Sequence, residues 1–220
     1  MNRYELAVFD LDGTLLDTTE GVLSAVRDTI TELGLAIPPK EILLGFIGPP
    51  IQDSFARTFG LEGEILQEIA TLFRNQYCRE ELLLLAKPYD GIFDLLEELC
   101  QRGIRPAVAT YKREDYALRL LSYFGFDRYT EIMFGGDHEN TLKKKDIIER
   151  CLSVGGVPRE HAVMIGDTAH DAVGANAAGV DFLGVTYGFG FRCTEDVAKC
   201  PSVGSSDTPL GLLKFFKKNR

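Results

Sequence analysis

Short apolar runs recur along the chain, and the later ones alternate with helical patterns. Each run is rich in strand-forming residues and bounded by polar residues or glycine, as in buried strands. The runs are Leu6–Phe9, Ile104–Ala109, Ile132–Phe134, Ala162–Ile165 and Phe182–Val185. The helical patterns are Gly91–Gln101, Glu114–Tyr123, Lys144–Leu152 and Ala169–Ala178. This alternation predicts βαβ units and a mostly parallel sheet, and therefore an α/β fold.

One connection is far longer than an ordinary crossover. About seventy residues separate the first strand from the helical pattern at Gly91, whereas most connections in compact domains are short. Helical spacing appears within it at Thr18–Leu33, Ser54–Phe59 and Glu64–Leu85, with proline and glycine between these segments. We therefore expect an α/β core of residues 1–16 and 88–220, and an inserted all-helical cap domain of residues 17–87.

Amino-acid composition and net charge indicate which kinds of binding partner to expect. The 220 residues are 45% hydrophobic, which suffices for a real core, and the net charge is −9. Such a surface repels nucleic-acid backbones and anionic membranes, so neither is an expected partner. The apolar stretch Leu82–Ala86 is too short to span a bilayer. The five cysteines form no CxxC pair, which favours reduced thiols and a cytoplasmic location.

Polar residues follow three of the predicted strands. Asp10 and Asp12 come after the first, Thr110 after the second, and Asp167 and Asp171 after the fourth. Ligands of open parallel sheets bind beyond the carboxyl ends of the strands, so these acids should form one cluster. Clustered carboxylates repel each other unless a cation or a proton separates them. No histidine or cysteine pair lies nearby, and Mg²⁺ is the hard cation that fits best.

Four segments together resemble a known family. Asp10-Leu11-Asp12-Gly13-Thr14 resembles DxDGT, the first signature of the haloacid dehalogenase-like hydrolases. Thr110 resembles the second signature, a lysine that opens a later helix the third, and Gly166–Asp171 the fourth, GDxxxD. The position of the insert resembles the small helical cap of the subgroup that contains phosphoglycolate phosphatases. The resemblance implies a Rossmann-like doubly wound core and a Mg²⁺-dependent phosphatase.

The resemblance also implies a role for each matched residue. Asp10 would be the nucleophile that forms an aspartyl-phosphate, and Asp12 the general acid and then the general base. Mg²⁺ would contact Asp10, the backbone carbonyl of Asp12, and Asp167, while Asp171 orients the waters of the metal. The implied phosphate-binding set is Asp10, Leu11, Asp12, Thr110, Tyr111 and Lys144, with Leu11 and Tyr111 contributing backbone amides.

The lysine is ambiguous because Lys143, Lys144 and Lys145 are adjacent. At about 100° per residue, Lys144 falls in the middle of the apolar stripe of its helix, while its two neighbours fall on the flanks. The pattern therefore favours Lys144, with Lys143 as the alternative. Lys112, two residues after Thr110, either adds positive potential to the site or is an ordinary solvated lysine.

The insert contains one candidate specificity segment. Phe46, Ile47, Gly48 and Pro49 lie where caps of this kind carry a substrate-facing loop, although a simple interhelical turn explains the pattern equally well. The expected substrate is a small phosphorylated metabolite. Phosphoglycolate comes first, and pyrophosphate, nucleoside monophosphates and sugar phosphates stay open.

Two other functions remain as alternatives. A phosphosugar mutase of the same family would carry a histidine shortly after the first signature, and Asp17–Val22 contains none. A non-catalytic phosphate-binding protein would not need the intact set of acids, threonine and lysine. A dehalogenase is disfavoured because Asp12 is present. The chain alone leaves the choice between monomer and homodimer open.

Overall fold

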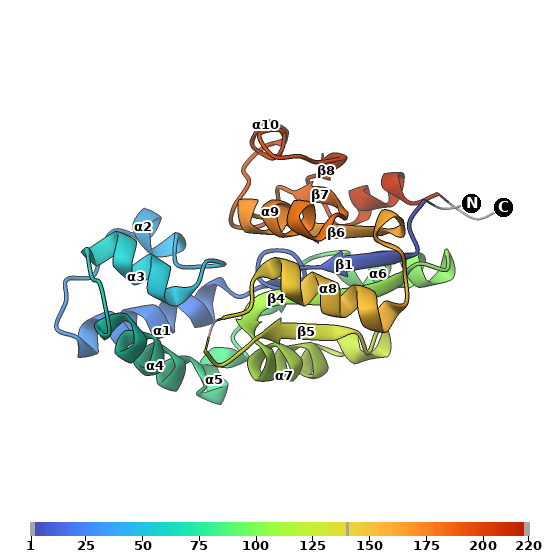
Figure 1. The fold of residues 1–220 in the computed structure, drawn as a ribbon. Helices are drawn as coiled ribbons and strands as arrows, with labels where there is room; N and C mark the ends of the chain where they lie inside the picture. The colour runs from blue at the N-terminus through green and yellow to red at the C-terminus, as the bar shows by residue number, and fades with distance from the viewer. Residues whose placement is uncertain (1–2, 140, 218–220) are drawn as a thin grey trace. The chain divides into compact units, whose positions relative to one another are not determined.

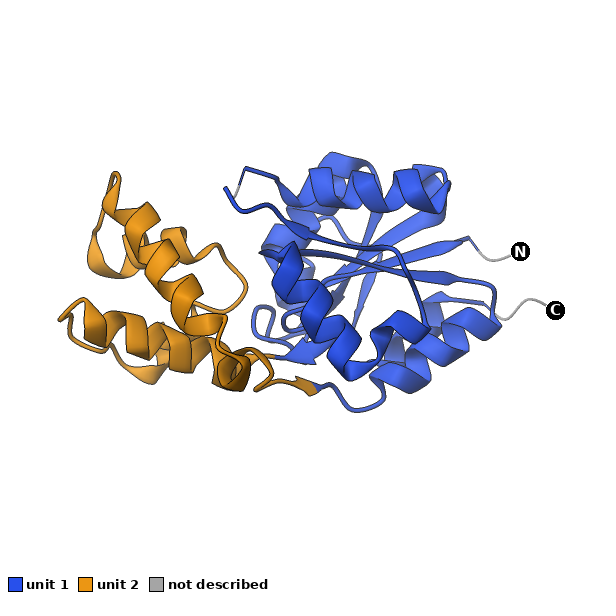
Figure 2. Cartoon of the chain, turned by 90° about the horizontal axis from the view of Figure 1, so that it is seen from below, with its two compact units in different colours: residues 1–17, 88–220 blue, residues 18–87 orange. Residues whose placement is uncertain are grey.

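The computed structural model describes residues 3–139 and 141–217, and the chain divides into two compact units (Figure 1). The first, here called the α/β unit, comprises residues 1–17 and 88–220, and the second, the helical unit, comprises residues 18–87 (Figure 2). The chain leaves the α/β unit after Asp17 and returns at Pro88. None of the helices in the described part of the chain is long and apolar enough to cross a membrane.

A six-stranded sheet forms the centre of the α/β unit. In spatial order its strands are β5 (Met133–Gly136), β4 (Arg105–Arg113), β1 (Leu6–Phe9), β6 (Ala162–Gly166), β7 (Asp181–Val185) and β8 (Gly204–Ser206). The neighbouring strands pair in parallel. A parallel sheet of this kind is the α/β architecture that the alternating pattern predicts, and the prediction is confirmed.

Helices cover both faces of this sheet. Leu6 and Val8 point to one face of β1 while Ala7 and Phe9 point to the other, and all four side chains are fully buried. Two helices, α8 (Lys144–Gly155) and α9 (Ala169–Ala178), pack on the face of Leu6 and Val8. Burial on both faces explains why the strands read as continuous apolar runs.

The order in which the chain visits the strands reverses beside β1, and this reversal is the topological switch point of the sheet. From β1 the chain runs outward to β4 and β5 through α6 (Ile92–Gln101) and α7 (Glu114–Phe124). It then returns to β6 and runs outward on the other side through α9 to β7. Since crossovers between parallel strands are right-handed, this reversal places α6 and α7 on the face opposite α8 and α9. Ligands of doubly wound sheets bind where the strand order reverses.

Shorter elements complete the α/β unit. They are α10 (Thr194–Val197) and the 3₁₀ helices η1 (Phe126–Arg128), η2 (Arg159–His161) and η3 (Leu210–Phe215). A separate two-stranded sheet joins β2 (Leu16–Asp17) to β3 (Lys87–Pro88), the two points where the chain passes between the units. The strand β8 and the helix α10 have no counterpart in the predicted pattern.

The helical unit consists of five helices among the described residues. They are α1 (Thr19–Glu32), α2 (Lys40–Leu44), α3 (Ile51–Phe59), α4 (Ile65–Tyr77) and α5 (Glu80–Leu83). Gly21 in α1 permits a close approach, because a Cβ there would lie 2.1 Å from the carbonyl oxygen of Leu82. The ring of Phe46 packs edge-on against Phe55 at 5.2 Å between centroids, and both side chains are buried.

Two elements differ from the sequence-based expectation. The predicted helix Glu64–Leu85 is broken, because Arg79 takes φ −58° and ψ 131°, which lies outside the helical region. The strand expected to end at Ala109 continues to Arg113. Its pairing with β5 shifts register between Ala109 and Arg113, an irregularity that apolar periodicity does not reveal. Thr110 therefore lies within β4 rather than after it.

Candidate active site

The parallel register brings Asp10 and Asp167 together. Phe9 of β1 is opposite Ile165 of β6, and the amide of Asp10 donates to the carbonyl of Ile165 at 2.8 Å. The next residues of each strand therefore leave the sheet at the same edge. On the other side of β1, Phe9 is opposite Val108, which brings Thr110 of β4 to that edge.

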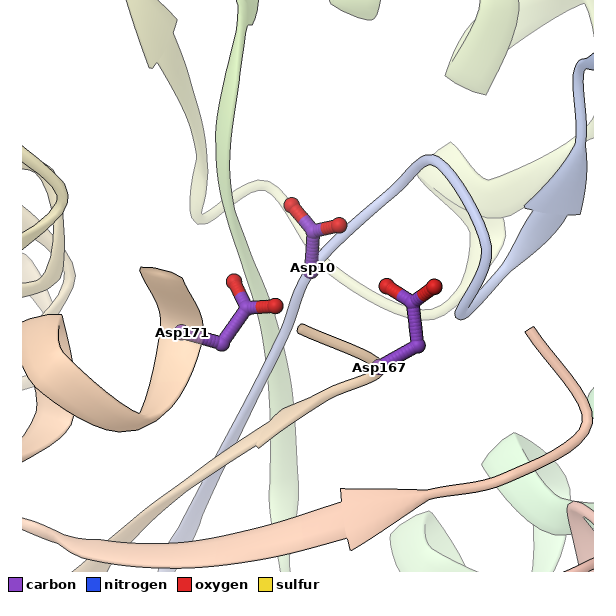
Figure 3. A group of neighbouring side chains, drawn as sticks. All are labelled: Asp10, Asp167 and Asp171. Carbon is purple, nitrogen blue, oxygen red and sulfur yellow. The ribbon is translucent and has the colours of Figure 1, made fainter. Parts of the chain in front are cut away.

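Three carboxylates form a buried cluster beyond this edge (Figure 3). Asp10, Asp167 and Asp171 each offer one oxygen, and these oxygens lie within 4.8 Å of one another. Asp171 enters from the first turn of α9, where its Oδ2 also accepts hydrogen bonds from the amide and hydroxyl of Thr168. The exposed fractions are 6%, 0% and 1%, so water screens their mutual repulsion poorly.

Burial and repulsion change the protonation of this cluster. Burial, with Asp171 and Asp12 as neighbouring charges, raises the pKa of Asp10 to about 7 even though Lys144 opposes the change. The pKa of Asp167 is also raised, by burial first and then by Asp171 and Asp10. Asp10 and Asp167 therefore stay protonated to a higher pH than exposed carboxyls do.

Lys144 lies between two of these acids. Its ammonium donates to Asp10 Oδ1 at 2.6 Å and to the carbonyl of Ala109 at 2.9 Å, and it lies 2.7 Å from Asp171 Oδ1. Burial opposes the lysine charge, but the two carboxylates outweigh that effect and the pKa of Lys144 is raised. Lys143, the alternative from the sequence, is exposed.

The side chain of Asp12 is not a member of the three-acid cluster and pairs with a lysine. Its Oδ1 is 3.1 Å from Nζ of Lys112, and the two side chains are 11% and 7% exposed. Asp12 begins a tight turn in which the carbonyl of Leu11 accepts from the amides of Leu15 and Leu16, both at 3.0 Å. Lys112 is therefore a buried ion-pair partner, and the solvated alternative for it is wrong.

Thr110 and Tyr111 connect β4 to the site in different ways. The hydroxyl of Thr110 is buried and accepts from the amide of Lys112 at 3.1 Å, so its own proton can donate to a phosphate oxygen. The hydroxyl of Tyr111 accepts from the amide of Lys144 at 3.0 Å. Tyr111 thus ties the first residue of α8 to the strand, a contact that the sequence does not indicate.

The oxygens of Asp167 fit a hard metal ion. Oδ2 accepts from the amides of Phe189 and Gly190 at 2.7 and 3.0 Å. Oδ1 is buried and has no hydrogen-bond partner among the described residues. A buried carboxylate oxygen without a partner is costly unless a proton or a cation satisfies it. A set made entirely of carboxylate oxygens suits Mg²⁺ better than softer metals.

Part of the predicted specificity segment belongs to the core of the helical unit. Phe46 and Ile47 are 2% and 4% exposed. Arg57 supports the same turn by donating to the carbonyl of Gly45 at 2.8 Å. Gly48, with φ +97°, and Pro49 are half-buried. A role in substrate selection for these four residues stays a prediction, and for Phe46 the structure gives a packing role.

Comparison with known proteins identifies relatives over most of the chain. The family model for haloacid dehalogenase-like hydrolases matches residues 7–185. A 5'-nucleotidase of Pseudomonas aeruginosa is 38% identical over 86% of this chain and 85% of its own length. A phosphoglycolate phosphatase of Agrobacterium fabrum is 34% identical over 84% of this chain and 81% of its own.

Two further relatives complete the comparison. The tyrosine-protein kinase PtkA of Mycobacterium tuberculosis is 34% identical over 84% of this chain. The matched residues span only 63% of the length of PtkA. A solved haloacid dehalogenase-like hydrolase of Streptococcus pneumoniae has a TM-score of 0.88 at 30% identity. That alignment covers 97% of this chain and 98% of the other.

Proposed function

The chain belongs to the haloacid dehalogenase-like hydrolase family, and from this premise we propose that it is a Mg²⁺-dependent phosphatase of small phosphomonoesters. Its relatives support a phosphoric monoester hydrolase. One observation supports the more specific proposal, a Mg²⁺-dependent reaction that starts from Asp10. Asp10 lies in a buried cluster with Asp167 and Asp171 and is paired to Lys144 at 2.6 Å. Its place directly after a strand at the switch point, beside acids that could hold a cation, supports Asp10 as the nucleophile.

In the first step the Asp10 carboxylate attacks phosphorus and forms an aspartyl-phosphate. The bond from phosphorus to the leaving oxygen breaks, and Asp12, which must carry a proton when the substrate binds, supplies that proton to the leaving oxygen. In the second step Asp12 takes a proton from a water molecule whose oxygen attacks phosphorus; the bond between phosphorus and the Asp10 oxygen breaks, inorganic phosphate is released and the Asp10 carboxylate is regenerated. Bound Mg²⁺, held by Asp10, Asp167 and the backbone carbonyl of Asp12, would reduce repulsion between the nucleophile and the phosphate.

Asp171, Lys144 and Thr110 support these steps. Asp171 would orient the waters of the metal from the first turn of α9. Lys144 holds Asp10 in position and offsets the negative charge that builds up around it. Thr110 would donate its hydroxyl proton to a phosphate oxygen, and the amides of Leu11 and Tyr111 would bind the other oxygens. Phosphoryl transfer depends mainly on such positioning and charge stabilisation.

The proposed substrate is a small phosphorylated metabolite, with phosphoglycolate first and nucleoside monophosphates second. The names of the relatives span both classes. Transfer of the phosphoryl group to a tyrosine hydroxyl is the second candidate, and the likeness to PtkA is the observation that favours it. Both candidates share the aspartyl-phosphate and differ only in whether water or a hydroxyl group accepts the phosphoryl group.

The test is the release of inorganic phosphate from a panel of phosphorylated metabolites, with Mg²⁺ and with EDTA. We expect turnover that needs the metal and that disappears in Asp10→Asn. Loss of the nucleophile should remove several orders of magnitude of rate, because enzymes accelerate reactions roughly 10⁶-fold or more. No hydrolysis of any substrate under any metal condition would refute the proposal. Phosphate transfer to a tyrosine peptide without release to water would establish the second candidate.

A further inference from the structure

The segment that follows β7 wraps around Asp167. Two of its amides, those of Phe189 and Gly190, donate to Oδ2 of Asp167 at 2.7 and 3.0 Å. The next amide, that of Phe191, donates to the backbone carbonyl of Asp167 at 2.8 Å. Three consecutive residues thus fix one acidic residue through their backbones. This segment, Tyr187–Phe191, contributes no carboxylate to the cluster.

Glycine at three positions makes this close approach possible. A Cβ on Gly188 would lie 2.2 Å from the carbonyl oxygen of Gly13 and 2.6 Å from Asp167 Oδ2. A Cβ on Gly190 would lie 2.3 Å from the carbonyl oxygen of Asp167. Gly13, which also has φ +83°, would place a Cβ 2.3 Å from Asp167 Oδ2. Any side chain at these positions displaces the carboxylate or the backbone that holds it.

Tyr187 connects the segment to the turn that follows Asp12. Its hydroxyl donates to the carbonyl of Thr14 at 3.0 Å, and its ring packs against Tyr89 at 4.9 Å between centroids. Burial is the largest cause of a strongly raised pKa of Tyr187. The hydroxyl therefore keeps its proton and the hydrogen bond persists at neutral and mildly alkaline pH. This hydrogen bond thereby joins the turn to the segment whose amides donate to Asp167.

The consequence for Asp167 is an asymmetric carboxylate. Two N–H donors satisfy Oδ2, whereas Oδ1 is buried without a hydrogen-bond partner in the described part of the chain. Rotation of the carboxylate would break both amide hydrogen bonds, so Oδ1 stays the oxygen available to a cation. Outer partners that orient a ligand in this way typically control metal affinity.

We propose that the Tyr187–Phe191 segment is the positioning element for the metal ligand Asp167, so that Mg²⁺ affinity depends on residues that do not touch the cation. This inference rests on the proposed function, because it takes Asp167 as a ligand of Mg²⁺. Tyr187 and Gly188 are positioning residues in this scheme. Their substitution should weaken the binding of Mg²⁺ while the turnover number at saturating Mg²⁺ changes little.

The experiment is isothermal titration of the full-length protein with MgCl₂, without substrate, for the wild type, Gly188→Ala and Tyr187→Phe. For Gly188→Ala we expect a weakening of roughly 10- to 100-fold, as for changes to the hydrogen-bond partners of metal ligands. For Tyr187→Phe we expect about 5-fold, the effect of one neutral hydrogen bond. Phosphatase assays over a range of Mg²⁺ concentrations should show the same change in half-saturation, with little change in kcat.

Two matched controls separate positioning from general destabilisation. Tyr123→Phe removes a hydroxyl from a tyrosine that is 63% exposed. Gly211→Ala crowds a glycine whose Cβ would lie 2.3 Å from Ser206 Oγ, a residue outside the acidic cluster. Both controls should bind Mg²⁺ like the wild type, whatever they do to the melting temperature.

The outcomes distinguish this inference from the proposed function. Unchanged Mg²⁺ affinity in Tyr187→Phe, with wild-type binding intact, would overturn the inference and leave the phosphatase proposal standing. Tyr187→Phe removes a single oxygen atom, so it decides the matter if Gly188→Ala does not fold. A wild-type protein that binds no Mg²⁺ would overturn both.

Discussion

The ammonium of Lys112 lies 3.1 Å from Oδ1 of Asp12, and neither side chain is more than 11% exposed. Lys112 lies within β4, two residues after Thr110, while Asp12 belongs to the turn after β1. Adjacent strands thus supply the proposed general acid and a cation that restrains it. A buried ion pair of this kind fixes the position of the carboxylate more firmly than water contacts would.

The Lys112–Asp12 pair leads to a prediction about leaving groups. Lys112→Met removes the cation 3.1 Å from Asp12, so the carboxylate should be positioned less firmly and proton transfer to the leaving oxygen should become less efficient. General acid catalysis contributes roughly 10²- to 10⁴-fold, so kcat for an alkyl phosphate should fall by about 10-fold or more. An aryl phosphate with a good leaving group needs little protonation and should lose much less. Equal losses for both substrates would contradict the role, and Lys112→Arg should restore part of the difference.

Lys143 and Lys144 are adjacent in the sequence but differ in burial, so substituting each one tests how much the buried lysine contributes to stability. Lys144→Met removes the cation between Asp10 and Asp171, whereas Lys143→Met changes an exposed side chain. Breaking a buried pair typically costs about 3 to 5 kcal/mol of unfolding free energy, while exposed substitutions stay within about 0.5 kcal/mol. Urea unfolding with EDTA at pH 8 measures both. Equal stability of the two variants would show that the lysine does not offset the charge of the acids.

The raised pKa of Asp10 predicts how pH and metal interact. Because that pKa is about 7 against an ordinary 3.8, the folded protein without metal binds more protons than the unfolded chain between these values. Its free energy of unfolding should therefore fall as the pH rises through this window. In the proposed site protons and Mg²⁺ would compete for the same carboxylates, so the metal should raise the melting temperature more at pH 8 than at pH 6.

Calorimetry at a fixed Mg²⁺ concentration and with EDTA tests this expectation. Asp10→Asn is the control, because an amide at this position cannot titrate and the variant should lose much of the pH dependence. A rise in melting temperature that is equal at both pH values, or larger at pH 6, would count against proton competition at the cluster.

The helical unit gives a prediction about packing. Phe46→Ala should destabilise the protein by about 3 to 5 kcal/mol, the usual cost of truncating a buried aromatic residue, because its ring is 2% exposed and packs on Phe55. Ile42→Ala, at a side chain that is 47% exposed, is the control and should change stability little. Thermal unfolding measures both. A Phe46→Ala variant as stable as the wild type would contradict the packing role.

The strands of the α/β unit could be predicted because each is short, apolar and buried on both faces. Leu6–Phe9 is identical in the sequence-based and structural assignments, and the switch point beside it follows from the order of the strands. The boundaries of β4 could not be predicted. Its last residues are polar, and the irregular pairing between Ala109 and Arg113 depends on β5. Local periodicity contains no information about such a partner.

The same limit applies to the site. Motif spacing locates Asp10 and Asp167 at one edge of the sheet, because both directly follow a buried strand. It does not reveal that Lys112 is buried against Asp12, or that amides of Phe189 and Gly190 hold Asp167, since these contacts join distant parts of the chain. The two glycines that flank Phe189 are the one signal that could have indicated a close backbone approach there.

The arrangement around Lys144 has a consequence for the choice of ion. When a bound cation displaces the protons of Asp10 and Asp167, the carboxylates of Asp10, Asp167 and Asp171 together with the one ammonium carry two net negative charges at a buried site. A divalent ion restores electroneutrality there, whereas a monovalent ion leaves a residual charge without solvent to screen it. We therefore expect the proposed site to favour a divalent over a monovalent ion through its charge alone, before ionic radius or coordination number is considered.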